Sequence, residues 1–299
     1  MASKFSDEGF ITFRGYKVWY GISGDEEEKG KLPLLCLHGG PGASHDYLTP
    51  LSALTNTGRR VIFYDQLGSG KSDHPDNPDL WTVELYVEEV GVVREALGLD
   101  RIHLLGHSWG GQLAMEYTLT KPPGHESLII ADSLADMSQW ISEANRLRAQ
   151  LPREVQEVMQ KHESKGTTDD PAYEEAGMEF YRRHMCRLEV WPDIVVKTFE
   201  NLAEYPQVYN TMWGPNEFNV TGTLKDWNIV DRLGEIDVPT LILSGRHDES
   251  TPAINETIHK GIKGSEWVIF ENSAHMPHIE EPERYLSVLN DFLERIESR

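Results

Sequence analysis

One serine stands where its hydroxyl could act as a nucleophile. Ser108 lies at the centre of GHSWG, residues 106–110, after the apolar run RIHLLGH and before GGQLAMEYTLTK, whose spacing predicts a helix. A serine between glycines at a strand-to-helix turn is typical of a nucleophile elbow, because glycines permit the sharp turn and keep bulk away from the hydroxyl. The amino end of the following helix also favours a developing anion. The alternative, a glycine-rich connection around a bystander serine, accounts less well for this context.

A serine hydroxyl needs a general base, and the base needs an acid that orients it. In this type of fold we expect the order serine, acid, histidine along the chain. Asp248 follows the apolar run VPTLILSG and His275 follows EWVIF, so both are expected beside Ser108 at the carboxyl edge of a sheet. Asp248 could instead cap a turn or helix, and His275 could be a surface-loop residue. His278 is a nearby competitor as the base, but the spacing from the last strand favours His275.

Backbone N–H groups aimed at a developing negative oxygen contribute strongly to acyl transfer. One such donor is expected from Trp109, the residue after the candidate nucleophile. The other is expected from HGGPG, residues 38–42, which follow the apolar run LPLLCL. We assign it to the N–H of Gly40, with Gly39 as the second choice. A plain tight turn would not explain so many glycines directly after a buried strand.

The segments that carry these residues alternate between strand-like and helix-like patterns. Buried strands are indicated by the runs LPLLCLHG, RRVIFYDQ, RIHLLGH and SLIIADS, and a helix by TVELYVEEVGVVREALGL. GFITFRG and YKVWYGI precede them and predict a hairpin that turns near Arg14 and Gly15. This alternation predicts an α/β fold with a mostly parallel sheet flanked by helices.

The alternation is interrupted in the middle of the chain. Residues 137–233 contain charged helical stretches and are rich in Trp, Tyr and Met. We interpret them as an inserted helical cap, or lid, over the site. Residues 1–136 and 234–299 then form the core domain that carries the sheet.

The chain of 299 residues is strongly acidic. It has 28 Lys and Arg against 49 Asp and Glu, a formal net charge of −21 at pH 7, which disfavours nucleic acid and anionic membrane surfaces as partners. An acidic soluble surface is the simplest explanation, and attraction of a cationic substrate is a sharper one. Cys36 and Cys186 do not make a disulfide framework, and no run resembles a signal peptide or reaches membrane-spanning length. We expect a cytoplasmic protein with no metal or other cofactor, and the oligomeric state is left open.

Five motifs together resemble a known family. HGGPG, YDQLGSGKSD, GHSWGG, GRHDESTP and SAHMPHIEEPE occur in this order. They resemble the α/β-hydrolase superfamily and, more narrowly, the proline iminopeptidase family of serine aminopeptidases, including the tricorn-interacting aminopeptidase type. Related amino-acid amidases share the pattern. The resemblance covers nearly the whole chain and implies an α/β-hydrolase core, a helical cap, no metal, and release of an N-terminal residue from short peptides. His107 departs from the Gln or Gly that often precedes the serine in this family.

The same resemblance assigns two glutamates to the free α-ammonium group of the substrate. In the family one acid follows the catalytic aspartate, which here is Glu249, and another lies in the cap, where GPNEFNVTGTLKDW offers Glu217. The α-nitrogen lies only about 2.5 Å from the scissile carbonyl carbon. Carboxylates close to Ser108 would therefore admit a free N-terminus and reject an acylated one. The alternatives are a solvated cap residue for Glu217 and a charge at a helix amino end for Glu249.

These residues predict a serine aminopeptidase that forms an acyl-enzyme from short peptides, amino-acid amides or arylamides. Whether proline is the preferred first residue is left open. The alternative is a small-molecule amidase, esterase or lactonase with the same triad, because the fold does not determine the substrate. A third class is a non-catalytic ligand receptor. Glu217 and Glu249 discriminate between the aminopeptidase and the esterase hypotheses, since a neutral ester has no evident use for them. Trp140, Tyr205 and Trp213 are candidates to line the pocket.

Overall fold

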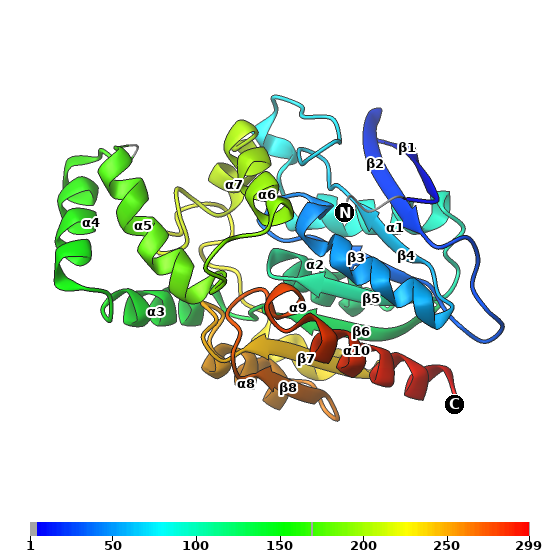
Figure 1. Ribbon diagram of the computed structural model, residues 1–299. Helices are drawn as coiled ribbons and strands as arrows, with labels where there is room; N and C mark the ends of the chain where they lie inside the picture. Colours follow the sequence, from blue (N-terminus) through cyan, green and yellow to red (C-terminus); the bar gives the residue numbers. More distant parts are fainter. Residues whose placement is uncertain (1–4, 169, 299) are drawn as a thin grey trace.

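The computed structural model describes residues 5–168 and 170–298 and contains one sheet of eight strands (Figure 1). The strands are β1 (Asp7–Phe13), β2 (Tyr16–Ser23), β3 (Leu34–Leu37), β4 (Val61–Tyr64), β5 (Ile102–His107), β6 (His125–Ala131), β7 (Thr240–Gly245) and β8 (Glu266–Phe270). Their order in the sheet is β1-β2-β4-β3-β5-β6-β7-β8. β2 pairs antiparallel with β1 and β4, and every later pair is parallel. The predicted α/β class with a mostly parallel sheet is confirmed.

The unbroken apolar runs of the sequence become central strands because both faces of the sheet are covered. Every residue of β3 and β5 is buried. In β3, Leu35 and Leu37 face one hydrophobic core, whereas Leu34 and Cys36 face the other. A strand with two buried faces therefore shows no alternation of apolar and polar residues.

Helices cover the two faces of the sheet (Figure 1). One face carries α1 (Val83–Ala96), α2 (Trp109–Leu119), η3 (Val230–Glu235) and α8 (Pro252–Gly261), and the other carries η1 (His45–Thr57), α9 (Pro277–Glu280) and α10 (Pro282–Glu297). The short η2 (Pro78–Leu80) precedes α1. The sequence patterns did not predict η1, a 3₁₀ helix that contains Pro50.

The amino-terminal hairpin turns where the sequence predicts it. Arg14 and Gly15 have positive φ angles of 50° and 89°, as a two-residue type I′ connection requires. The turn sets Phe13 opposite Tyr16 in the antiparallel register of β1 and β2.

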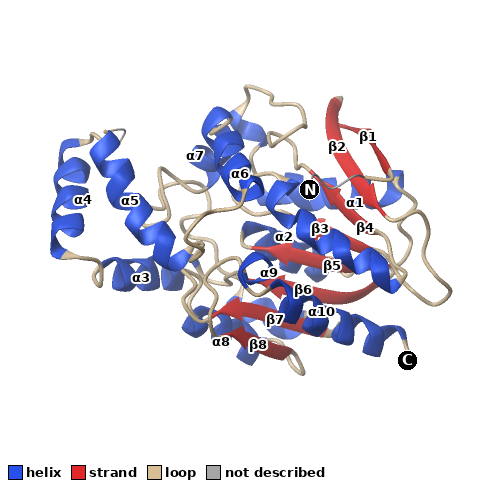
Figure 2. Cartoon of the chain, in the orientation of Figure 1, coloured by secondary structure: helices blue, strands red, loops and turns tan. Residues whose placement is uncertain are grey.

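In the described residues, five α-helices precede η3 in the segment between β6 and β7. They are α3 (Met137–Arg148), α4 (Arg153–Lys165), α5 (Pro171–His184), α6 (Asp193–Glu204) and α7 (Gln207–Met212). The start of α5 shows why the chain becomes helical there: the Asp170 side chain accepts the N–H of Ala172 at 2.9 Å, and Pro171 occupies the first turn. The inserted helices lie beyond the carboxyl ends of the parallel strands (Figure 2). All five fall within residues 137–233, the range predicted for the cap.

The sequence also raised the questions of membrane-spanning helices, metal ligands and reactive cysteines. Within the described residues, none of the helices is long and apolar enough to cross a membrane, and no cluster of three His, Cys, Asp or Glu side chains is arranged to hold a metal ion. Cys36 and Cys186 are both buried free thiols. Burial raises the pKa of the Cys186 thiol to about 11, so this group is not a reactive thiolate.

Candidate active site

Ser108 occupies a sharp turn between β5 and α2. Its backbone angles, φ 57° and ψ −124°, lie outside the usual regions for a residue with a side chain. The neighbouring glycines make the turn possible, because a Cβ at Gly106 would collide with the carbonyl of Gly110, and a Cβ at Gly110 would collide with the carbonyl of Leu37. Ser133 Oγ, in the loop after β6, donates to the Ser108 carbonyl at 2.8 Å and holds the turn.

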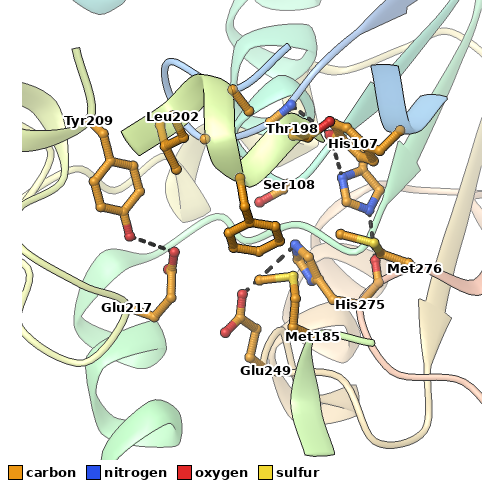
Figure 3. Close-up of a pocket in the computed structure, with 15 residues that line it drawn as sticks. His107, Ser108, Met185, Thr198, Leu202, Tyr209, Glu217, Glu249, His275 and Met276 are labelled. Atoms are coloured by element: carbon orange, nitrogen blue, oxygen red, sulfur yellow. Dashed lines mark hydrogen bonds and ion pairs between the residues drawn. The ribbon is translucent and has the colours of Figure 1, made fainter. Parts of the chain in front are cut away.

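The candidate acid and base meet Ser108 at the carboxyl edge of the sheet. His275 Nδ1 donates to Asp248 Oδ1 over 2.6 Å, and the N–H of Ser250 donates to the same oxygen at 2.8 Å. Ser108 and His275 line one cavity (Figure 3). Among the described residues no hydrogen bond joins Ser108 Oγ to His275 Nε2, and in unliganded sites such bonds often tighten only with substrate.

The competitor histidine is engaged elsewhere. His278 Nε2 donates to the backbone carbonyl of Tyr47 at 3.1 Å, and the side chain is buried. Burial lowers the pKa of His278 to about 3, so the ring is neutral. The structure therefore brings His275, and not His278, to Asp248.

The backbone N–H of Gly39, the second choice for the oxyanion hole, is already engaged in a hydrogen bond. The N–H of Gly39 donates to Tyr47 Oη at 2.8 Å and is engaged by that bond. Gly40, with φ 113°, lines the cavity beside Ser108. Trp109 is the first residue of α2, where N–H groups have no partner inside the helix. Gly40 and Trp109 remain the predicted pair of oxyanion donors.

His107 connects three segments of the site. Since Tyr47 Oη accepts the N–H of Gly39, its own proton is directed to His107 Nδ1, 2.9 Å away. His107 Nε2 then donates to the backbone carbonyl of His275 at 2.7 Å. Burial lowers the pKa of His107 well below its usual value, which agrees with a neutral ring. The residue is a packed, hydrogen-bonded part of the elbow, as expected from the sequence.

Glu217 and Glu249 both line this cavity (Figure 3). Glu217 Oε1 accepts the hydroxyl of Tyr209 at 2.6 Å, and its backbone carbonyl accepts Trp140 Nε1 at 3.0 Å. Glu249 Oε1 lies 3.9 Å from His275 Nε2. Glu249 Oε2 is buried and has no hydrogen-bond partner among the described residues.

Burial disfavours the charged form of both carboxyl groups. Burial raises the pKa of Glu217 to about 7, although the Tyr209 hydroxyl and His275 oppose the shift. Burial, together with repulsion from Glu217 and Asp248, raises the pKa of Glu249 well above its usual value. A positive group placed between Glu217 and Glu249 would relieve both effects.

The rest of the cavity is mostly apolar. The inserted helices supply part of its wall, and the lining side chains include Met185, Thr198, Phe199, Leu202 and Met276. Three aromatic candidates from the sequence lie elsewhere: Trp140 and Trp213 are buried and pack edge to face, and Tyr205 stacks on His74 at 3.7 Å.

Sequence reasoning missed Tyr47, Tyr209 and Asp132. Nothing in the local sequence marks the two tyrosines, because their partners come from distant segments. Asp132 directly follows the buried run SLIIA, and Asp248 follows LILSG after Arg246 and His247; an aspartate after a buried run is a signal that could have identified Asp132.

Comparison with known proteins identifies the family. Residues 33–282 match the family described as the alpha/beta hydrolase fold. The chain is 40% identical over 293 residues to a proline iminopeptidase of Saccharolobus solfataricus, a match that covers 98% of this chain and 94% of the relative. The chain belongs to the proline iminopeptidase family of α/β hydrolases.

Solved structures of this α/β-hydrolase family agree closely with the fold. The proline iminopeptidase of Mycobacterium smegmatis superposes with a TM-score of 0.91 at 40% identity, covering 97% of this chain and 99% of the other. The structure of VinJ superposes with a TM-score of 0.95 at 44% identity, covering 98% of this chain and 100% of the other. The resemblance read from the motifs is confirmed.

Proposed function

We propose that this α/β hydrolase is a serine aminopeptidase that releases the first residue of short peptides, amino-acid amides or arylamides. Family membership supports the reaction class, since relatives that align over nearly their whole length are proline iminopeptidases. The two buried free thiols are compatible with action in a reducing cytoplasm.

The proposed reaction uses Ser108 as the nucleophile and His275 as the general base. Ser108 Oγ attacks the carbonyl carbon of the first residue while His275 Nε2 takes its proton and then passes it to the leaving amine. Asp248 keeps the imidazole in the tautomer that exposes Nε2. The N–H groups of Gly40 and Trp109 stabilise the oxyanion. Water then hydrolyses the acyl-enzyme by the same proton path in reverse and releases the free amino acid.

The observation that carries the proposal is the position of Glu217 and Glu249. Both carboxyl groups line the cavity that holds Ser108 and His275, and the Glu249 side chain is buried. An α-ammonium group lies about 2.5 Å from the carbonyl carbon under attack, so it would enter the space between these acids when that carbon meets Ser108. Pairing with the ammonium group offsets the cost of burying the two carboxylates. An esterase or lactonase acting on a neutral substrate would have no group to do this.

The test compares substrates that differ only in the charge of the amine. We would measure kcat/KM for prolyl-, alanyl-, leucyl- and phenylalanyl-arylamides, each with a free and an N-acetylated amine, together with a short-chain aryl ester. Ser108→Ala serves as the blank. Cleavage of the free-amine substrates that is lost on acetylation is the expected result, and the ranking of residues reports the specificity.

Two results would contradict the aminopeptidase proposal. Equal turnover of acetylated amides or of the ester would indicate a general hydrolase that does not bind an ammonium group. No turnover above the Ser108→Ala blank would indicate that the cavity does not process amino-acid derivatives at all.

A further inference from the structure

A second aspartate lies against the acid of the proposed triad. Asp132 follows β6 as Asp248 follows β7, and β6 and β7 are neighbours in the sheet. Both side chains are buried, and Asp248 lies close enough to Asp132 to raise its pKa. The proposed mechanism assigns no role to Asp132.

The other contacts of these two carboxyl groups determine which oxygens meet. Asp248 Oδ1 accepts from His275 Nδ1 at 2.6 Å and from the N–H of Ser250 at 2.8 Å. Asp132 Oδ1 accepts the N–H of Gly245 at 3.0 Å. Within the described part of the chain, Oδ2 of Asp132 and Oδ2 of Asp248 are both buried and receive no hydrogen bond from another group. One proton held between them satisfies both oxygens.

Among the described residues no Lys or Arg pairs with Asp132. His107 Nε2 lies 3.7 Å from Asp132 Oδ2 and already donates to the His275 carbonyl. Since burial keeps His107 neutral, it supplies no positive charge. Glu280, the other acid that influences Asp132, adds repulsion.

We propose that Asp132 is a positioning residue of the triad, in which its protonated Oδ2 donates to Oδ2 of Asp248 so that the two carboxyl groups carry a single negative charge. Asp248 holds that charge, because its Oδ1 accepts two hydrogen bonds whereas Asp132 Oδ1 accepts one. Both oxygens of Asp248 are then fixed, and Oδ1 stays in line with His275. Burial and the nearby Asp248 raise the pKa of Asp132 well above its usual value, which supports the protonated form.

If Asp132 and Asp248 share one negative charge, replacing Asp248 by asparagine should transfer that charge to Asp132. In an Asp248→Asn variant, His275 and Ser250 both donate to the Oδ1 position, so the amide oxygen occupies it and the NH₂ group points to Asp132. Asp132 then loses its proton and becomes the ionised member. The negative charge moves one side chain away from His275 but is not lost.

The proposal rests on the proposed serine-hydrolase triad, so its test needs one readout that is independent of peptidase activity. We would compare Asp132→Asn, Asp248→Asn and the double variant. Asparagine suits position 132 because, like aspartate, it tolerates the positive φ of 51° found there. For each variant we would measure the rate at which a fluorophosphonate phosphonylates Ser108, and kcat/KM for a free-amine arylamide. Ser108→Ala serves as the blank.

If the two aspartates share one charge, the double variant should be much less active than either single variant. Asp132→Asn keeps a donor to Asp248 and should stay within about threefold of the parent. Asp248→Asn should lose about 10²-fold, whereas the double variant, with no charge left, should lose about 10⁴-fold, as when a triad acid is replaced by its amide. A double variant no slower than Asp248→Asn would overturn the proposal.

The independent readout is carbon NMR of protein labelled at the aspartate carboxyl groups. One buried carboxyl resonance should have the chemical shift of a protonated acid at pH 7 and should disappear in Asp132→Asn. If every aspartate is ionised at pH 7, the shared proton is excluded, whether or not the protein cleaves peptides. A protonated Asp132 in a protein that fails the arylamide assay would leave this inference standing and overturn the proposed function instead.

Discussion

At the scale of single residues, the site depends on how many donors each buried carboxyl group receives. Asp248 receives two hydrogen bonds on one oxygen. Glu217 receives one from Tyr209, and Glu249 Oε2 receives none within the described residues. Because a buried carboxylate without donors is unstable as an anion, Glu217 and Glu249 are suited to bind a cation, and Asp248 is suited to orient a base.

Replacing Glu217 by glutamine should therefore weaken recognition of the free amine. The variant keeps a group that can accept from Tyr209 but loses the charge that faces the ammonium group. We expect kcat/KM for a free-amine arylamide to fall about 10²-fold, since loss of one partner of a buried ion pair costs about 3 kcal/mol. Glu200→Gln removes the same charge from an exposed position on α6 and should have no measurable effect. A similar loss in both variants would contradict the assignment.

The pH dependence of the same substrate should report the ionisation of Glu217. Its pKa is raised to about 7, so the carboxylate that binds the ammonium group forms only as the pH rises through this value. We expect the ratio of kcat/KM between the parent and Glu217→Gln to increase from pH 5 to pH 8 with a midpoint at about 7. The ratio cancels the titration of the substrate amine, which is the same for both proteins. A ratio that is independent of pH would show that Glu217 does not titrate in this range.

At the scale of elements, the inserted helices are bonded directly to the loops that carry the site. The N–H of Glu249 donates to the His184 carbonyl at 3.1 Å, and the N–H of His275 donates to the Met185 carbonyl at 3.1 Å. On the other side, Lys197 of α6 pairs with Asp46 of η1 at 2.6 Å. The end of α5 and the helix α6 thus position the loops after β7, β8 and β3 as well as closing the cavity.

The packing of α7 on the HGGPG loop gives a test of this coupling. Gly42 has φ 91°, and a Cβ there would lie 3.0 Å from Val208 Cβ and 3.3 Å from the Tyr209 nitrogen. Gly42→Ala should displace α7, which carries the Tyr209 hydroxyl bonded to Glu217, and should cost about 1–2 kcal/mol of stability. We expect kcat/KM for free-amine substrates to fall about tenfold, because both the oxyanion loop and Glu217 move.

Gly91 provides the matched control for the Gly42→Ala experiment. It lies within α1, and a Cβ there would meet nothing within 4 Å. Gly91→Ala should leave activity unchanged and raise the thermal unfolding temperature slightly, since alanine is favoured over glycine inside helices. Equal activity of Gly42→Ala and Gly91→Ala would show that α7 does not need to approach this loop closely.

At the scale of the whole molecule, the last helix is fixed to the amino ends of the central strands. Glu297 of α10 accepts from Arg59 Nη1 at 2.7 Å and from the N–H of Leu32 at 3.0 Å, and it lies 3.3 Å from His103 Nε2. The Arg59 side chain is fully buried. This cluster lies at the end of the sheet opposite the cavity and joins residues 30–103 to the end of the chain.

Glu297→Gln should destabilise the fold without changing the site. It leaves the buried Arg59 without a counter-ion, which costs about 3 kcal/mol and lowers the unfolding temperature by on the order of 5 °C. Although burial opposes ionisation, His103, Leu32 and Arg59 bring the pKa of Glu297 to about 2. Its contribution is therefore complete above the unfolded pKa of about 4.5 and is lost as the pH falls toward 2.

Calorimetry of Glu297→Gln between pH 8 and pH 3 would test the role of this cluster. The difference from the parent should be constant from pH 8 to pH 5 and should shrink below pH 4.5. Glu294→Gln, in the same helix but half exposed, should change stability by less than about 1 kcal/mol. A difference that grows as the pH falls would contradict the role given to Glu297.

The sequence by itself determined the class of fold, the order of strands and helices along the chain, and the candidate residues whose surroundings are local. Ser108 between glycines, the loop 38–42 after a strand, and the positions of Asp248 and His275 after apolar runs can be read without coordinates, because each signal lies within about ten neighbouring residues. Only the tertiary structure decided which histidine meets Asp248, that Gly39 is engaged by Tyr47, and that Asp132 shares the interior with Asp248. These facts depend on contacts between segments distant in sequence and on the loss of solvent around them, and a linear pattern carries neither.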